Sequence, residues 1–239
     1  MKSPMTLTDT VGEWVTSHPA TSRVFERLNI DYCCGGGRPL EDACREASVD
    51  AQSILSDLSA VVSQDAHETN DDFISRSLAE MCDAIEATHH EYLRRELPRL
   101  SQLVQKVVSV HGEQHPWLSR LAESYRQLRG ELESHMMKEE RILFPAIRTI
   151  EQTRRVPDFP FGSVDNPIRM MEHEHDVAGQ ALRDIRAASS NYTVPEGGCN
   201  TFRAMLDGLR ELGLELHQHI HRENNILFPR ASRLAASLA

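Results

Sequence analysis

Hydrophobic residues recur every three or four positions along most of this 239-residue chain, which is the spacing of amphipathic helices. Four long stretches follow this pattern, over about residues 72–103, 114–150, 165–190 and 197–233. No alternating pattern typical of strands competes with them. Four amphipathic helices of this length bury their apolar faces against one another. We therefore predict an all-α fold, built on an up-down-up-down four-helix bundle.

A shorter helical pattern precedes the bundle and predicts a separate small helical domain at residues 1–62. Its helices are expected near residues 8–17, 21–28, 40–47 and 50–62. Residues 63–72 are polar, which is typical of a linker. The bundle is then expected to occupy residues 72–235.

One motif occurs twice in the bundle, beginning at His135 and at His219, and both copies read His-x-x-x-Glu-x-x-Ile-Leu-Phe-Pro. Residues four apart lie on one face of a helix, so His135 points the same way as Glu139, and His219 the same way as Glu223. The apolar neighbours, the Ile of each copy included, share this face. Titratable groups in an interior stripe are costly unless they are paired or bound to metal. Imidazole and carboxylate suit iron, zinc or copper, so the motif predicts a metal site. The proline that closes each copy is expected near a helix end.

The repeat extends beyond this motif. His90 lies 45 residues before His135, and His175 lies 44 residues before His219. The four helices are thus two copies of a helical hairpin, and pseudo-twofold pairing predicts four histidines and two glutamates around one cavity. His175 follows the apolar phase of its helix. In the first helix that phase favours His89, and the repeat spacing does not separate His89 from His90.

A ferritin-like di-iron carboxylate site is the strongest enzyme alternative, because such sites use Glu-x-x-His on two helices and a single Glu on two others. The sequences Glu-Ala-Thr-His, ending at His89, and Glu-His-Glu-His, ending at His175, match that pattern. This arrangement leaves His135 and His219 on interior faces with nothing to bind. The histidine-rich site is therefore favoured.

Composition narrows the classes of function. The net charge of −10 gives no electrostatic support for nucleic-acid binding. The N-terminus lacks the pattern of a signal peptide, and no apolar run approaches the roughly 18 residues of a membrane span. We expect no membrane association and a cytoplasmic location. Five cysteines, two of them adjacent, do not resemble a disulfide framework.

The adjacent cysteines, Cys33 and Cys34, are followed by three glycines at residues 35–37. Glycines free the backbone to adopt positive φ and would expose the sulfurs. The pair lacks the C-x-x-C spacing of zinc ribbons, so a structural zinc is not favoured. Two interpretations stay open: a reactive or metal-contacting thiol pair, or inert cysteines in a tight turn.

These residues resemble the iron-centre repair family of di-iron proteins, of the RIC or ScdA type, over nearly the whole chain. Residues 31–36, Asp-Tyr-Cys-Cys-Gly-Gly, are similar to the signature of that family's N-terminal domain. Residues 135–140 (His-Met-Met-Lys-Glu-Glu), 174–176 (Glu-His-Asp) and 223–225 (Glu-Asn-Asn) resemble its hemerythrin-like domain. The extra Gly37 is a small departure from a two-glycine signature.

The resemblance implies two non-haem iron ions per chain, oxo-bridged, in a hemerythrin-like bundle. The metal ligands that it implies are His90, His135, Glu139, His175, His219 and Glu223. Counting back from Leu97 and Pro98 places the family's first ligand on His90 rather than His89. The two ligand glutamates are expected to bridge the irons, with two histidines on each. Glu131 and Glu174 are expected to support these ligands or to form an iron exit path.

Members of this family are thought to restore iron–sulfur clusters damaged by nitric oxide or peroxide, as iron donors. The resemblance therefore implies damaged iron–sulfur proteins as clients, nitric oxide or oxygen as small ligands, and a homodimer. It makes the chain a non-enzymatic iron donor. From the chemistry of thiolates, we further expect Cys33 and Cys34 to receive iron or a nitrosyl group from the centre, or to pass it to a client. Two alternatives stay open: a nitric oxide reductase, and a nitric oxide or oxygen carrier or sensor. The Cys-Cys domain argues against a simple carrier, since oxygen storage needs no thiols.

Overall fold

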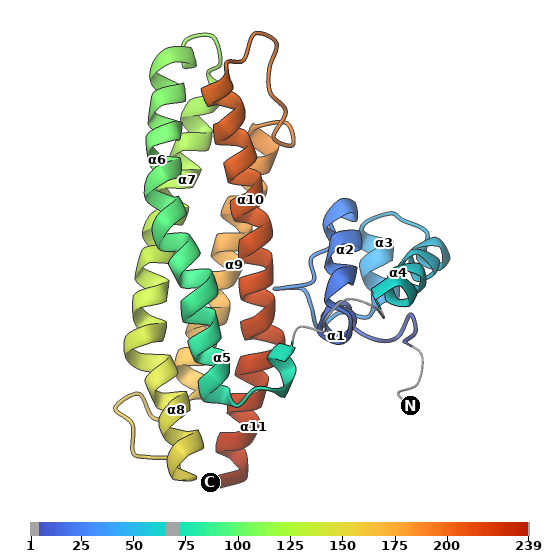
Figure 1. Ribbon diagram of the computed structural model, residues 1–239, viewed down its shortest axis with the longest axis vertical. Helices are drawn as coiled ribbons and strands as arrows, with labels where there is room; N and C mark the ends of the chain where they lie inside the picture. Colours follow the sequence, from blue (N-terminus) through green and yellow to red (C-terminus); the bar gives the residue numbers. More distant parts are fainter. Residues whose placement is uncertain (1–4, 66–71, 239) are drawn as a thin grey trace.

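The computed structural model describes residues 5–65 and 72–238, and their regular secondary structure is helical. Four long antiparallel rods form a bundle, and a group of shorter helices lies beside it (Figure 1). The rods run up, down, up and down in chain order, so the predicted all-α four-helix bundle is confirmed. Among the described residues, no helix combines the length and the apolarity that crossing a bilayer requires.

Three of the four rods contain one π-helical turn. The first rod consists of α5 (Leu78–Ile85), η3 (Glu86–His90) and α6 (Glu91–His111), preceded by the short 3-10 helix η2 (Asp72–Ser75). The second consists of α7 (Trp117–Lys138), η4 (Glu139–Leu143) and α8 (Phe144–Thr153). The third is α9 (Asp165–Ala188), and the fourth consists of α10 (Asn200–Arg222), η5 (Glu223–Leu227) and α11 (Phe228–Leu238).

The π turns shift the helical phase, because each adds one residue to a turn. In the first rod, both His89 and His90 are buried, at 2% and 0% exposure. In the second rod, the expectation that Ile142 lies inside is wrong, since its side chain is 46% exposed. The turn η4 instead brings Leu143 and Phe144 into the core.

The prolines that close the two motif copies lie inside rods, not at their ends as expected. Pro145 is the second residue of α8, and Pro229 is the second residue of α11. Each proline follows a π turn, with one residue between them, at a point where the regular α-helical hydrogen-bond pattern is already interrupted, and its fixed φ fits a helix. Both helices therefore continue past their proline.

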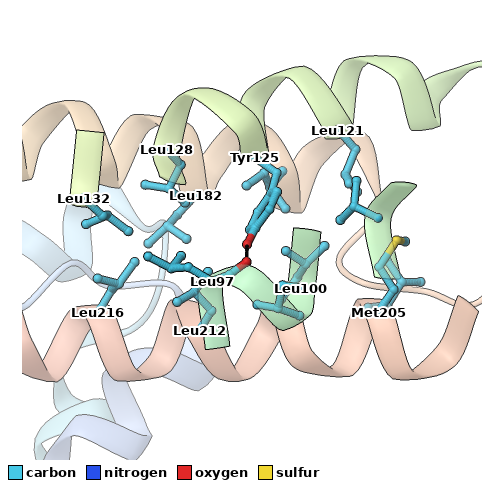
Figure 2. Close-up of a cluster of buried hydrophobic side chains, with 14 of the residues drawn as sticks. Leu97, Leu100, Leu121, Tyr125, Leu128, Leu132, Leu182, Met205, Leu212 and Leu216 are labelled. Atoms are coloured by element: carbon cyan, nitrogen blue, oxygen red, sulfur yellow. Dashed lines mark hydrogen bonds between the residues drawn. The ribbon is translucent and has the colours of Figure 1, made fainter. Parts of the chain in front are cut away.

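An apolar cluster fills the half of the bundle formed by α6, α7, α9 and α10 (Figure 2). Its leucines are almost fully buried, and each contributes about 1.5–3 kcal/mol when removed from water. The Tyr125 hydroxyl donates to the carbonyl oxygen of Leu97 at 2.6 Å, so this buried hydroxyl has a hydrogen-bond partner (Figure 2). Leu132 and Leu216 close the cluster at one end, three residues before the histidines of the repeated motif.

A second apolar cluster fills the other half, where α5, α8, α11 and the start of α9 meet. It includes Met81, Phe144 and Phe228, each at most 1% exposed. The buried histidines and glutamates of the repeat lie along the rods between the two clusters. The bundle therefore holds its polar layer between two rigid apolar blocks.

The N-terminal helices form a third cluster around Trp14, Phe25 and Leu40. They are α1 (Val11–Ser17), η1 (Pro19–Thr21), α2 (Ser22–Leu28), α3 (Leu40–Glu46) and α4 (Ala51–Asp65). Part of the predicted linker at residues 63–72 belongs to α4, and its residues 66–71 lie outside the described residues. Ile220 of α10 packs into this cluster, so the N-terminal helices share a core with the bundle.

Asn225, in η5, connects the bundle through its side chain to residues 31–37, which carry Cys33 and Cys34 and which we call the cysteine turn. Its side-chain amide donates to the carbonyl oxygens of Cys33, at 3.1 Å, and Tyr32, at 3.4 Å. Its amide oxygen lies against Gly12 and Gly36, where an added Cβ would stand 2.5 and 2.4 Å from it. Glycine is required at both positions because any side chain would displace this amide.

The N-terminal helices also cover two histidines of α10 that helical phase places on the outer face of the bundle. His217 and His221 are expected to be solvated, but His221 is only 5% exposed and His217 is half-buried. The Tyr32 ring lies edge-on to both imidazoles, at 6.0 and 5.6 Å between centroids. The expectation fails because the N-terminal helices cover this face of the bundle.

Candidate metal centre

Six titratable side chains converge between the two apolar clusters and form two adjacent groups. They are His90, His135, His175 and His219, with Glu139 and Glu223. In each group the possible ligand atoms lie within 4.8 Å of one another, and both glutamates belong to both groups. We call the group with His90 and His219 position A, and the group with His135 and His175 position B.

Each carboxylate lies between one histidine of position A and one of position B. The Oε2 atom of Glu139 is 3.3 Å from the Nε2 atoms of both His90 and His135. The two oxygens of Glu223 lie 3.1 and 3.0 Å from the Nε2 atoms of the histidines on α9 and α10. This is the placement that a carboxylate bridging two metal ions requires.

The buried polar atoms of this layer fit a metal centre. Glu139 and Glu223 are both 0% exposed. Their four oxygens make no hydrogen bond, nor do the Nε2 atoms of His90 and His219. A buried ionised carboxylate without compensation costs several kcal/mol. Two cations would supply that compensation, and imidazole with carboxylate is a donor set that suits iron.

Outer hydrogen bonds orient three of the four histidines. Each uses Nδ1 toward an oxygen outside the centre, which turns Nε2 inward. The pairs are His90 with Glu140 at 2.7 Å, His135 with Glu174 at 3.0 Å, and His175 with Asn224 at 2.8 Å. Such contacts fix the tautomer and raise the basicity of a ligand. The outer contacts thus hold three ring nitrogens in place facing the centre.

Sequence reasoning found one of these outer partners and missed two. Glu174, which the sequence suggests as a supporting residue, contacts His135, whereas Glu131 makes no hydrogen bond or ion pair within the described part of the chain. Glu140 and Asn224 were missed, although each directly follows the glutamate of a motif copy. That shared position is the signal that could have identified them.

The phenylalanine of each motif copy also has a role in the centre. Phe144 stacks on His90, with 5.9 Å between ring centroids and 11° between planes. Phe228 stacks on His175 in the same way, at 6.1 Å and 4°. Each copy therefore supplies an outer hydrogen bond and an aromatic wall to a histidine of another rod, which explains why the repeat extends past its glutamate.

His89 lies outside both positions. Its Nδ1 is 2.7 Å from Oε1 of Glu215, and its Nε2 accepts from the Arg222 guanidinium at 3.0 Å. With both nitrogens used, no lone pair is left for metal. Nor does either position contain Glu86, which pairs with Arg148, or Glu172, so the structure does not assemble the ferritin-like arrangement. We accordingly propose His90 as the ligand.

Alanine substitutions should separate the two neighbours. His90→Ala is expected to lower the iron content of the purified protein and to alter the absorption of the bridged di-ferric centre, because position A loses one of its two imidazoles. His89→Ala should leave iron content unchanged. Loss of iron in His89→Ala alone would contradict this assignment, and the same behaviour in Glu86→Ala would favour the ferritin-like site.

The carboxylates give the histidines unequal proton affinities. Burial opposes protonation of His135, but Glu139 and Glu174 outweigh it and raise its pKa to about 10. Burial lowers the pKa of His219 to about 4, although Glu223 opposes that change.

The cysteine turn is organised by Asp31, which sequence reasoning did not single out. One carboxylate oxygen of Asp31 accepts from the backbone N–H groups of Cys33 and Cys34, both at 3.0 Å, and from the Cys33 thiol at 3.2 Å. The two sulfurs are 3.9 Å apart. Ligand atoms of all three residues lie within 4.8 Å of one another. The turn therefore gathers two thiols and one carboxylate.

The glycines of this turn act through close packing, not through positive φ as expected, since positive-φ glycines among the described residues occur only at Gly162 and Gly197. Nor are both sulfurs exposed: Cys33 is buried, and hydrogen bonding to Cys34 with burial raises its pKa. Cys34 is half-buried, and its sulfur lies 3.8 Å from the point where a Cβ on Gly179 would stand.

The fold and this centre are those of a hemerythrin-type bundle. Residues 83–231 match the family model of the hemerythrin HHE cation binding domain, and residues 7–62 match that of the ScdA_N domain, described as a domain of unknown function. The iron-sulfur cluster repair protein YtfE of Edwardsiella ictaluri is 40% identical over 222 residues, which cover 92% of this chain and 95% of that protein.

Proteins of the same name in two other organisms are similar. The protein of Shigella boydii is 38% identical over 221 residues, covering 92% of this chain and 95% of its own. That of Yersinia pseudotuberculosis is 36% identical over 224 residues, covering 93% and 96%. The chain belongs to this family of iron–sulfur cluster repair proteins with a hemerythrin domain, and the resemblance seen in its motifs is confirmed.

Proposed function

We propose that this chain restores iron–sulfur clusters damaged by nitrosative or oxidative stress, and that it does so by donating iron from a di-iron centre. The observation that carries the proposal is the pair of adjacent positions that share two buried carboxylates without hydrogen bonds. The names of the relatives support the repair role. The clients are then proteins with damaged clusters, and the protein acts as a donor, not as an enzyme.

Two non-haem iron ions per chain, with an oxo bridge, are part of this proposal. His90 and His219 would hold one ion, His135 and His175 the other, with Glu139 and Glu223 across both; together these six residues contribute only two negative charges. Compared with a carboxylate-rich site, such a set holds ferrous iron less tightly. Weak holding is useful in a donor, and the iron supplies the exchangeable ion that a damaged cluster lacks.

Glu174 is proposed to support the ligands of position B, and Glu131, one turn before His135, to lie in the same outer layer. Glu174 contacts His135 on one side and Lys138 on the other, and it is the part-exposed neighbour of position B. Burial opposes its ionisation, but the hydrogen bonds from His135 and Lys138 prevail and lower its pKa to about 2. A carboxylate that stays ionised keeps its contact with His135 and so holds this imidazole in place.

The thiols of Cys33 and Cys34 are proposed to receive iron or a nitrosyl group from the centre, or to pass it to a client. Thiolates are soft ligands that compete for ferrous iron. Cys34 lies against Gly179, which follows the ligand His175 by one helical turn. The contacts of Asn225 hold the turn at this place on the bundle. A cytoplasmic location, a homodimer, and nitric oxide or oxygen as small ligands belong to the same proposal.

An iron-transfer assay tests the function. Protein loaded with ⁵⁷Fe is incubated anaerobically with a nitrosylated [4Fe–4S] hydro-lyase, and enzyme activity is followed together with the Mössbauer spectrum of the re-isolated client. We expect recovered activity and ⁵⁷Fe in the client cluster. Free ferrous iron at the same concentration, with a chelator present, is the control. Nitrous oxide formation with all ⁵⁷Fe retained by the donor would instead favour a nitric oxide reductase.

A further inference from the structure

The two metal positions differ in how their histidines are supported. At position B, both imidazoles have an outer partner, because His135 pairs with Glu174 and His175 with Asn224. At position A, only His90 has one. The Nδ1 atom of His219 is buried and makes no hydrogen bond. One ligand of position A therefore lacks the contact that the other three share.

A ring takes the place of a hydrogen-bond acceptor beside His219. His89 stacks on it with 5.1 Å between ring centroids and 6° between planes. His89 in turn is fixed by Glu215 and Arg222, which occupy both of its nitrogens. His89 therefore has no free nitrogen to bond to His219, and it contacts this imidazole only by stacking on it.

The outer carboxylates of the two positions have similar surroundings. Glu140 accepts from His90 and pairs with Arg94, and Glu174 accepts from His135 and pairs with Lys138. The difference between the positions therefore lies at His219, whose Nδ1 has no outer partner. Outer partners raise the basicity of a histidine ligand and fix its ring, and removing one typically lowers metal affinity 10- to 100-fold. Position A should therefore bind a given ion more weakly than position B, by about 10-fold or more.

We propose that the ion at position A, held by His90 and His219, is the one the protein gives up first, and that the ion at position B is retained. His89 is a positioning residue in this arrangement, because it keeps polar partners away from His219. The inference rests on the proposed di-iron centre and adds an order of release to it. The centre then works as one exchangeable ion beside one anchoring ion.

Release kinetics test the order. Di-ferrous protein is mixed anaerobically with a chromophoric ferrous chelator, and we expect two phases of one iron each, with rates that differ by about 10-fold or more. Asn224→Ala removes an outer partner from position B, so it should accelerate the slow phase about 10-fold and leave the fast phase unchanged. Asn224→Asp, which keeps an acceptor and adds charge, should slow it. Gln180→Ala, at an exposed position of α9, is the matched control and should change neither phase.

Diffraction identifies the retained ion. Protein depleted to one iron per chain is crystallised, and anomalous difference density at the iron absorption edge should lie between His135 and His175. Density between His90 and His219, equal density at both positions, or release of both ions in a single phase would overturn the inference while leaving the di-iron centre intact. Failure to bind two irons at the outset would instead overturn the centre itself.

Discussion

The double variant Glu139→Ala, Glu223→Ala is expected to bind almost no iron, whereas the unchanged protein should bind two ions per chain. Both carboxylates lie between positions A and B, so their removal affects both ions at once. The four histidines that are left are neutral ligands and offer no charge to offset two buried cations. Metal analysis of the purified protein and loss of the bridged di-ferric absorption provide the measurement.

A matched control separates this effect from damage to the fold. Glu131→Ala removes a glutamate one turn before His135 that makes no hydrogen bond or ion pair among the described residues, and it should keep both irons. Far-ultraviolet circular dichroism should show full helix content in both variants. The metal-free double variant no longer buries two carboxylates without hydrogen bonds, so it is expected to fold without a metal. Two irons still bound to it would show that the assignment of the glutamates is wrong.

The sequence was sufficient for the bundle and for the proximity of its histidines and glutamates, because both follow from periodicity and repetition. A helix repeats every 3.6 residues, so a stripe of leucines ending in His135 and Glu139 must face the core. Because the same motif occurs again at His219 and Glu223, it is improbable that the first copy arose by chance. These residues do converge in the structure, and their role as metal ligands stays a prediction.

Local irregularities were not predictable in the same way. A π turn inserts one residue without a characteristic residue type, so the phase on its two sides no longer agrees. This is why periodicity favoured His89, whereas the structure brings His90 into position A, and why Ile142 was expected inside. The π turns begin or end at His90, Glu139 and Glu223, the three points where a rod aims a possible ligand at the centre.

Contacts between segments far apart in the sequence could not be predicted from local pattern either. No period in α10 shows that His221 is covered, because the cover comes from Tyr32, far away in the sequence. The sequence suggested that the glycines make the turn flexible. In the structure, Gly36 leaves room for the side-chain amide of Asn225, which lies where a Cβ would stand. Such close approaches depend on how two separate cores dock, which local pattern does not encode.

The variant Cys33→Ala, Cys34→Ala is expected to keep both irons and to lose most of its repair activity. Iron content should not change because every proposed ligand comes from the bundle. Transfer to a client should fail if the ion or its nitrosyl group passes through the thiols, which are the soft ligands beside α9. The ⁵⁷Fe transfer assay gives the measurement, with iron content determined on the same sample.

Two neighbouring glycines test whether the thiols must be docked as well as present. Gly36→Ala would place a Cβ 2.4 Å from the amide oxygen of Asn225 and 2.6 Å from the Tyr32 carbonyl oxygen, so the turn must move off η5. Gly37→Ala meets no atom within 4 Å and is the matched control. We expect Gly36→Ala to retain iron and both thiols yet to transfer poorly, and Gly37→Ala to transfer normally. Full transfer by the double cysteine variant would place the whole activity in the bundle. Full transfer by Gly36→Ala alone would show that thiols act without this docking contact.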